Sequence, residues 1–452
     1  MRNIWLAGLM SCLLITPTMG QTTALTIQEC RQMALEHNKD IAASKYQTLY
    51  ADYTRKSYLG NFFPDIKATG IGLNSNMSAN LGIPAFMLPV VTVDPEGAFT
   101  QNGSFASFPG MDVNFKVGTV YGGAISIEQP IFMGGKIIAA YKSAKEGLRM
   151  AEQSEALTKS EIIMNTENAY ALLIKAQEME LVAQSYHELL IELEKNVESA
   201  VRNGMKQKND LLKVQVVVGS SELVLLKAQN AVKLAAMNLC HMIGYSLGTD
   251  IRATGDYPLV QQQALNRSDI TARPEYAILE SQVEMARQNV KIQRSEILPQ
   301  LGVMGAYGYG NGVKVNGNKV IDRSSYAVML KLSIPIYHFG ERTNKIRAAK
   351  AQLRQKELEQ ESLQEQMLLE LTQEANRLDE AFKEAEIAAK ALESAKENRE
   401  VSQKHYENGM ETLTNLLEAQ SLWQQAYEKD VEAHFGLYTQ YVSYLKASGQ
   451  LK

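Results

Sequence analysis

The chain has 452 residues, of which 45% are hydrophobic and 21% charged, and its formal net charge at pH 7 is −4. A charge so near balance excludes the basic footprint of a nucleic-acid-binding protein and the basic face of a peripheral membrane protein. The length corresponds to two or three ordinary domains. We therefore expect no nucleic acid among its partners.

The first 20 residues have the pattern of a signal peptide. Arg2 is followed by an apolar run over 4–15 and then by the helix breaker Pro17. A membrane-spanning helix needs roughly 20 apolar residues, which neither this run nor any later segment supplies. We therefore expect residues 1–20 to be a leader, and any membrane-spanning part of the mature chain to be built from strands. Cys12, inside the leader, only faintly resembles a lipidation site.

Two strands are expected in the first half, at about 65–76 and about 119–133. The first opens at Pro64, and the second alternates apolar with small or polar residues, which is the period of a strand. The chain between them carries about 30 more residues than the equivalent stretch of the second half. Because long insertions are tolerated on exposed loops, we interpret its proline-rich part, 83–109, as a surface loop.

A long helical hairpin should follow these strands. Residues 136–203 contain no proline and a single glycine, so they can form one helix of ~100 Å at 1.5 Å per residue. Gly204 should end this helix, since glycine adopts the left-handed conformation at little cost, and the helical pattern resumes over 206–245. We expect two antiparallel helices with Gly204 at their tip.

The second half repeats the first 205 residues further along the chain. Pro130-Ile131-Phe132 returns as Pro335-Ile336-Tyr337, and Asn203-Gly204-Met205 returns as Asn408-Gly409-Met410. A period of this length is too large for a solenoid repeat. We therefore interpret the mature chain as two similar structural repeats related by a pseudo-twofold axis.

The two repeats would be 21–247 and 248–452. The expected elements of the second repeat are two strands and a helical hairpin, at about 300–311, 325–337, 341–408 and 411–447, with the tip at Gly409. The predicted fold class is mainly α with a small β part. It combines long antiparallel helical hairpins, in a coiled-coil arrangement, with four strands per chain in a duplicated half-repeat.

Four strands with one apolar face cannot stand alone in a membrane. Such a sheet has two open edges, and lipid offers no hydrogen-bonding partner for them. Three chains would close a twelve-stranded barrel whose polar side chains face a wet lumen, namely Ser126, Glu128, Lys331 and Ser333. The alternative is a soluble sheet packed on the helices, which would make the chain a periplasmic coiled-coil scaffold or adaptor without a pore. A detergent-requiring, heat-modifiable oligomer would favour the channel.

Together these elements resemble the TolC-like family of outer-membrane efflux and secretion channels, over essentially the whole mature chain. The resemblance rests on two strand-end motifs and one tip pattern. These are Gln129-Pro130-Ile131-Phe132 with Gly135, Ile334-Pro335-Ile336-Tyr337 with Gly340, and Tyr406-Glu407-Asn408-Gly409 followed by Thr412, Leu416-Leu417, Ala419 and Gln420. The order of the motifs, their fixed offset and the long helices make the match specific.

The resemblance implies a homotrimer in the outer membrane of a Gram-negative bacterium, with its barrel in outer-membrane lipid and its helices forming a tunnel in the periplasm. It implies a passive duct, gated at the helical tips, that exports small molecules or proteins to the exterior. The implied partners are a periplasmic adaptor (membrane fusion) protein and an inner-membrane pump of the RND or ABC type. Together they would form a tripartite efflux or type I secretion complex.

The resemblance also implies roles for residues at the two tips. Gly204-Met205 and Gly409-Met410 would contact the adaptor, because glycine lets a partner backbone approach closely. The alternative is that they are turn residues only. Two positions of the family's acidic gate ring fall on Asn415 and Glu418, so one negative charge remains at each copy. Three copies of Glu418 would favour cations at the constriction.

The first-half equivalents of these gate positions are Asp210 and Lys213, and Lys213 is opposite in charge to Glu418. Tyr406 matches a tyrosine of the family's gate latch, whereas the usual basic partner of that tyrosine aligns here with Glu411. This departure concerns the chemistry of the latch and not the location of the gate.

The sequence lacks the patterns of an enzyme. Its six histidines have no i, i+4 pair, no Gly-x-Ser-x-Gly motif occurs, and the glycine-rich stretches do not open helices. We expect no catalytic residue, no metal site and no cofactor. Cys30 and Cys240 lie in helical patterns, and they are either two buried thiols or a disulfide formed in an oxidising compartment.

Overall fold

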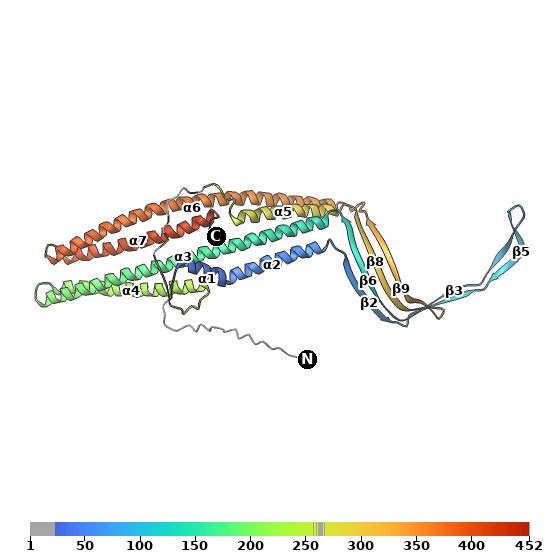
Figure 1. Cartoon of the computed structure of the whole chain (residues 1–452), viewed down its shortest axis with the longest axis horizontal. Helices are drawn as coiled ribbons and strands as arrows, with labels where there is room; N and C mark the ends of the chain where they lie inside the picture. The colour runs from blue at the N-terminus through green and yellow to red at the C-terminus, as the bar shows by residue number, and fades with distance from the viewer. Residues whose placement is uncertain (1–22, 256, 259, 261–264, 266, 452) are drawn as a thin grey trace, which may run out of the picture. The chain divides into compact units, whose positions relative to one another are not determined.

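The computed structural model describes residues 23–255, 257–258, 260, 265 and 267–451 (Figure 1). The expected signal peptide and Cys12 lie outside the described residues. The chain forms two compact units, to which both halves of the sequence contribute. The helical unit holds the described residues up to Ala51, Gly147–Val283 and the chain from Lys356 onward; the strand unit holds Asp52–Glu146 and Glu284–Gln355.

Two helical hairpins of nearly equal length dominate the structure. α3 (Lys136–Arg202) is followed by α4 (Lys208–Ile243), and α6 (Glu341–Glu407) is followed by α7 (Leu413–Ala447). α3 and α6 have 67 residues each and begin 205 residues apart, so the duplication extends to the helix ends. The expected long helical hairpins are confirmed. Their ends are local features, because an absence of proline and a terminal glycine act on the backbone directly.

Three shorter helices complete the helical part: α1 (Ile27–His37), α2 (Lys39–Gly60) and α5 (Pro274–Ser295). α1 begins with a capping box, in which Glu29 N–H donates to Thr26 Oγ1 (3.4 Å) and Thr26 N–H donates to Glu29 Oε2 (2.8 Å). Two short strands, β1 (Thr23–Leu25) and β7 (Ile251–Ala253), pair in parallel. No helix in the described part of the chain is both long and apolar enough to cross a lipid bilayer.

The helical unit contains a fully buried carboxylate, Glu167 of α3. Glu167 accepts hydrogen bonds from Arg31 Nε of α1 and from the hydroxyl of Tyr438 in α7. Burial raises the pKa of Tyr438 to about 12, so this hydroxyl remains a donor at neutral pH. A buried carboxylate is costly unless it is paired and hydrogen-bonded, so this network fixes α1, α3 and α7 against one another.

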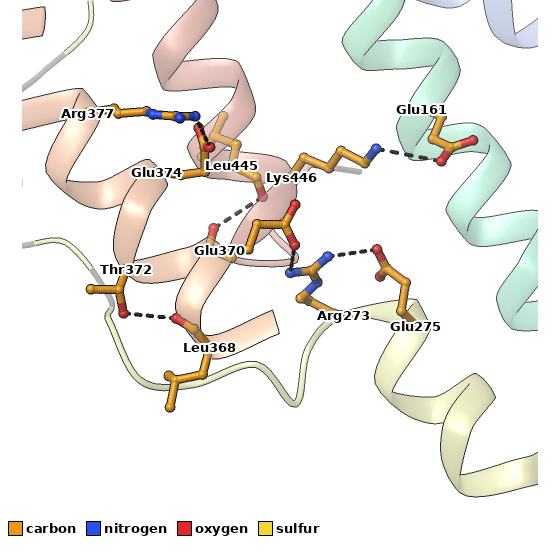
Figure 2. A network of polar contacts seen from close by, with 11 residues as sticks. Glu161, Arg273, Glu275, Leu368, Glu370, Thr372, Glu374, Arg377, Leu445 and Lys446 are labelled. Atoms are coloured by element: carbon orange, nitrogen blue, oxygen red, sulfur yellow. Dashed lines mark hydrogen bonds and ion pairs between the residues drawn. The ribbon is translucent and has the colours of Figure 1, made fainter. Parts of the chain in front are cut away.

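A second polar network anchors the C-terminal helix, as Figure 2 shows. Arg273, 5% exposed, donates to Glu370 of α6 (2.7 Å) and to Glu275 of α5 (2.9 Å). Lys446 Nζ of α7 lies 3.6 Å from a carboxylate oxygen of Glu161 in α3. The two sets of contacts tie the start of α5 to the second hairpin, and the end of the second hairpin to the first.

The strand unit is built on one antiparallel sheet with the strand order β2-β6-β8-β9. The strands of the unit are β2 (Asp65–Asn74), β3 (Ser78–Ile83), β4 (Phe86–Val93), β5 (Phe99–Phe108), β6 (Met111–Met133), β8 (Gln300–Val315) and β9 (Asn318–Ser333). Figure 1 shows β2, β6, β8 and β9 side by side. The small β part of the expected fold class is therefore present.

The insertion expected as a surface loop is instead made of strands. β3 extends the sheet along β6, while β4 and β5 form a separate hairpin. Asp94 organises the hairpin turn, because its Oδ1 accepts the N–H groups of Glu96 (3.1 Å) and Ala98 (2.8 Å). Apolar residues of high β propensity outweigh the proline content here, and Pro89 lies at a β-bulge, where its missing N–H is tolerated.

The boundaries of two strands differ from those predicted from the sequence. The strand expected at 119–133 begins at Met111, because its first part pairs with β3 and with the end of β8. The strand expected at 325–337 runs from Asn318 to Ser333. Ser333 pairs with Gln300, the first residue of β8, so β9 ends where its partner strand begins.

The register gathers most of the bulky apolar side chains of β6, β8 and β9 on one face of the sheet. Ile125, Tyr307 and Tyr326 are successive Cα partners across three strands. The apolar side chains on this face that are 45–81% exposed are Ile66, Tyr121, Ile125, Ile127, Tyr307, Tyr326, Val328, Leu330 and Leu332. Ser126, Glu128, Lys331 and Ser333 lie on the other face. Among the described residues, β2 and β9 each pair with a single strand, so both sheet edges are open.

Candidate functional site at the hairpin tips

Both hairpin tips have the same backbone conformation. Gly204 (φ 71°) and Gly409 (φ 74°) are left-handed, and each helix closes with the N–H of the next methionine bonded to a carbonyl five residues back. Met205 N–H donates to Ala200 O (2.8 Å) and Met410 N–H to its equivalent, His405 O (2.8 Å). A Cβ added at either glycine would meet no atom within 4 Å, so the outer side of each turn is open.

The two methionines at the tips are exposed. Met205 and Met410 have 69% and 68% of their surface accessible. At the end of each hairpin, one flexible thioether side chain beside open glycine backbone forms a compact apolar contact point. The four residues expected at the adaptor contact therefore lie at the two tips, in equivalent positions.

Asp210 and Asn415 lie at the start of the two return helices. Asp210 Oδ2 accepts the N–H of Gln207 (3.4 Å), and the N–H of Asn415 donates to Thr412 Oγ1 (3.3 Å). Such contacts satisfy N–H groups that have no partner within the helix. A carboxylate at this place also interacts favourably with the helix dipole. The two predicted gate positions thus take part in helix capping.

Glu418 lies one turn further along α7 and is exposed. In the described parts of the chain no residue forms an ion pair with it, so its carboxylate is available to an ion in solution. Its repeat equivalent, Lys213, is also exposed. The two hairpins therefore present opposite charges at equivalent depths behind their tips.

Tyr406 contacts the tip of the first hairpin. The Nζ atom of Lys206 lies 4.8 Å from the centroid of the Tyr406 ring, a cation–π geometry. Burial raises the pKa of Tyr406, and the negative charge of Asp210 raises it further, so the hydroxyl is neutral near pH 7. The contact joins the two hairpins within one chain.

Sequence reasoning found no cation for Tyr406, because the family's basic position aligns here with the acidic Glu411. Glu411 instead accepts a hydrogen bond from Ser402 within the second hairpin (3.2 Å). The cation comes from Lys206, the residue that occupies the equivalent place in the first repeat. The 205-residue offset was the signal that could have found it, because it maps Lys206 onto Glu411.

An apolar cluster behind the tips holds the hairpins together. It includes buried residues of α3, α4 and α7: Tyr186, Leu190, Leu193, Val197, Val214, Leu413, Leu416 and Trp423. Tyr406 packs against this cluster, and the guanidinium of Arg399 lies 4.4 Å from the Trp423 ring centroid. Nε of Arg399 and Oε2 of Glu411 are buried with no hydrogen-bond partner in the described structure. The tips thus combine an apolar contact with polar groups that are only partly satisfied.

Elsewhere the described residues offer little chemistry. No group of three or more His, Cys, Asp or Glu side chains in them is arranged to hold a metal ion. Cys30 and Cys240 are buried free thiols rather than a disulfide. Burial raises the pKa of Cys30 to about 12 and also raises that of Cys240, which keeps both thiols protonated and unreactive.

Comparison with known proteins agrees with this architecture. The family model for outer membrane efflux proteins matches residues 30–245 and 262–450. The chain is 24% identical over 336 residues to the pyoverdine export outer membrane protein OpmQ of Pseudomonas aeruginosa, an alignment that covers 70% of this chain and 67% of OpmQ.

Solved channels share the fold at low sequence identity. The Campylobacter jejuni CmeC outer membrane channel is 16% identical, with a TM-score of 0.76 over 94% of this chain and 86% of that one. The Vibrio cholerae outer membrane protein VceC is 15% identical, with a TM-score of 0.73 over 94% of this chain and 96% of that one. The family match spans both repeats with their strands and tips, and the chain belongs to the outer membrane efflux protein family.

Proposed function

We propose that the protein is a homotrimeric outer-membrane channel that passively exports small molecules, or proteins, from the periplasm to the exterior. The observation that carries this proposal is the exposed apolar face of a four-stranded sheet with two open edges. Such edges are not tolerated in lipid, and pairing β9 of one copy with β2 of the next removes them. Three copies supply twelve strands, an even number within the range of outer-membrane barrels.

The polar face of the sheet would then line the pore. Ser126, Glu128, Lys331 and Ser333 share that face, opposite the exposed apolar side chains. The family relative OpmQ carries pyoverdine export in its name, which supports an organic cargo for this channel as well. Export through a passive duct needs a separate source of energy, and we assign that task to an inner-membrane pump of the RND or ABC type.

The helical hairpins would extend into the periplasm, with their tips forming the gate. The exposed Met205 and Met410, beside open glycine backbone, support docking of a periplasmic adaptor that links the channel to its pump. Lys206 on Tyr406 would hold the first hairpin against the second in the closed state. Three copies of Glu418 would set the charge preference of the constriction.

The channel and its gate can be tested on the purified protein. We expect a heat-modifiable trimer that needs detergent and conducts ions in planar bilayers. Glu418→Gln should lower the preference for cations without changing trimer yield, because it removes charge at nearly constant shape. Glu397→Gln, an exposed carboxylate of α6 well before the tip, is the matched control and should behave as wild type.

A freely soluble chain would refute the channel and favour the alternative of a periplasmic scaffold or adaptor. Equal cation preference in Glu418→Gln and wild-type channels would refute the role of Glu418 alone.

A further inference from the structure

The strand unit contains a cavity of about 840 Å³ where the sheet meets the helices. Its floor is the face of the sheet that carries Glu128 and Lys331. One wall comes from the end of α2 and the loop after it, including Tyr58 and Phe63, and another from the first turns of α3, including Lys136 and Ile137. The volume lies within the range of roughly 300–1,000 Å³ that holds drug-sized ligands.

The strand register brings three methionines onto the cavity floor. Glu128, Met304 and Met329 are successive Cα partners across β6, β8 and β9, so their side chains lie in one row on one face. A β-bulge between Pro130 and Phe132 shifts the phase of β6, which places Met133 on the same face opposite Gln300. All three methionines line the cavity.

These methionines give the floor an adaptable apolar surface. The thioether side chain is flexible and polarizable, and it packs well against aromatic and alkyl groups of varied shape. Gly302 lies beside Lys331 in the next row, so the ammonium group of Lys331 is reached without an intervening side chain. The cavity therefore presents an apolar floor with charged groups at its margins.

The charged groups are of both signs, and three of them form no ion pair within 4 Å with any described residue. Asp65 is engaged, since Lys67 Nζ lies 2.6 Å from its carboxylate. Within the ranges that the structure describes, no ion pair involves Glu128, Lys136 or Lys331. An anionic ligand could pair only with the lysines, and a cationic ligand only with Glu128. A zwitterion could pair with both kinds of group.

We propose that this cavity is a binding site for zwitterionic, amphipathic organic molecules of drug size. Ligand binding by the cavity does not depend on the proposed export function. The further claim, that the ligand is cargo in transit through the channel, rests on that function. The cavity floor is the face opposite the exposed apolar side chains, so the geometry assigns the ligand to a mobile solute rather than to the headgroup of a surrounding lipid.

The test is protection of an introduced thiol in the full-length trimer, reconstituted in nanodiscs. Met329→Cys places a thiol on the cavity floor, and Ala327→Cys, two residues along the same face of β9 and outside the cavity lining, is the matched control. Cys30 and Cys240 are 0% exposed and will not react with a maleimide. The probes are three decyl amphiphiles below their micellar concentrations: a sulfobetaine, a trimethylammonium salt and a sulfate.

We expect the sulfobetaine, at about four times its Kd, to slow labelling of Met329→Cys about five-fold. Labelling of Ala327→Cys should be unchanged, and the singly charged probes should protect less. Adding Glu128→Gln or Lys331→Met to Met329→Cys should abolish the preference for the zwitterion. Equal protection at both positions, or equal protection by all three probes, would overturn the proposal.

Two further arms separate the alternatives. If Met329→Cys is protected without probe in phosphatidylethanolamine nanodiscs and reactive in phosphatidylglycerol nanodiscs, the ligand is a lipid headgroup and the assignment to a solute is wrong. Conductance of the same trimers is measured in parallel. Conducting trimers without protection refute the site and leave the channel standing, while protected trimers that do not conduct refute the channel and leave the site standing.

Discussion

Replacing Lys206 with methionine should destabilise the closed arrangement of the tips. The change removes the cation that lies 4.8 Å from the Tyr406 ring centroid and keeps a side chain of similar reach. Both residues are half-buried, and they belong to different hairpins. Lys206→Met therefore removes a link between hairpins while leaving the apolar cluster behind the tips in place.

The size of the effect follows from the burial of the pair. Cation–π contacts contribute about 0.5–1 kcal/mol when exposed and about 2 kcal/mol when desolvated, so we assign about 1 kcal/mol to this half-buried one. That corresponds to roughly a five-fold change in the closed-to-open ratio per copy. If the three copies of the proposed trimer open together, the combined effect is about 3 kcal/mol, or roughly 150-fold.

The measurement is the open probability of single channels in planar bilayers. Lys208→Met is the control, because it removes the same charge two residues away, at the exposed first residue of α4. Tyr406→Leu should open the channel as Lys206→Met does, and the double variant should add little to either. If Lys206→Met matches Lys208→Met, or if the effects of Lys206→Met and Tyr406→Leu simply add, the proposed latch is wrong.

Three other perturbations have defined outcomes. Gly409→Ala should cost about 1 kcal/mol of stability by forcing a left-handed alanine, whereas Gly147→Ala, inside α3, should stabilise by about 0.5–1 kcal/mol, both read from trimer melting. Glu167→Gln should lower the free energy of unfolding by about 2 kcal/mol in the same assay. This is less than for a fully buried ion pair, because Arg31 is 37% exposed. An unchanged melting temperature would show that the buried charge is dispensable. The pKa of the Cys30 thiol is raised to about 12 in the folded protein, against about 9 in the unfolded chain. The thiol therefore contributes stability that is complete below pH 9 and is lost as the pH rises toward 12. Cys30→Ala should remove this alkaline loss of stability between pH 9 and 12.

The two repeats also differ at the tips, where the channel would be controlled. At equivalent positions behind the tips, Lys206 faces a tyrosine ring and Glu411 accepts a hydrogen bond from a serine. Lys213 and Glu418 likewise carry opposite charges.

Helices and tips were determined by the sequence alone. The ends of α3 and α6, one residue from the predicted 203 and 408, depend on signals within a few residues, namely an absence of proline and a left-handed glycine. The duplication could also be read from the sequence alone, because the same residue types recur at a fixed offset of 205 residues. The alternation that placed Ser126 and Glu128 on one face of a strand could be read in the same way.

Tertiary structure decided what depends on a distant partner. β9 ends at Ser333 because β8 begins opposite it, and β3 forms because β6 lies beside it, whereas β4 and β5 pair with each other. Lys206 reaches Tyr406, and three methionines share a cavity floor, only after segments far apart in sequence are brought together. Backbone conformation responds to the nearest residues, whereas strand ends, cation–π contacts and cavities are relations between segments, and for that reason only the folded chain reveals them.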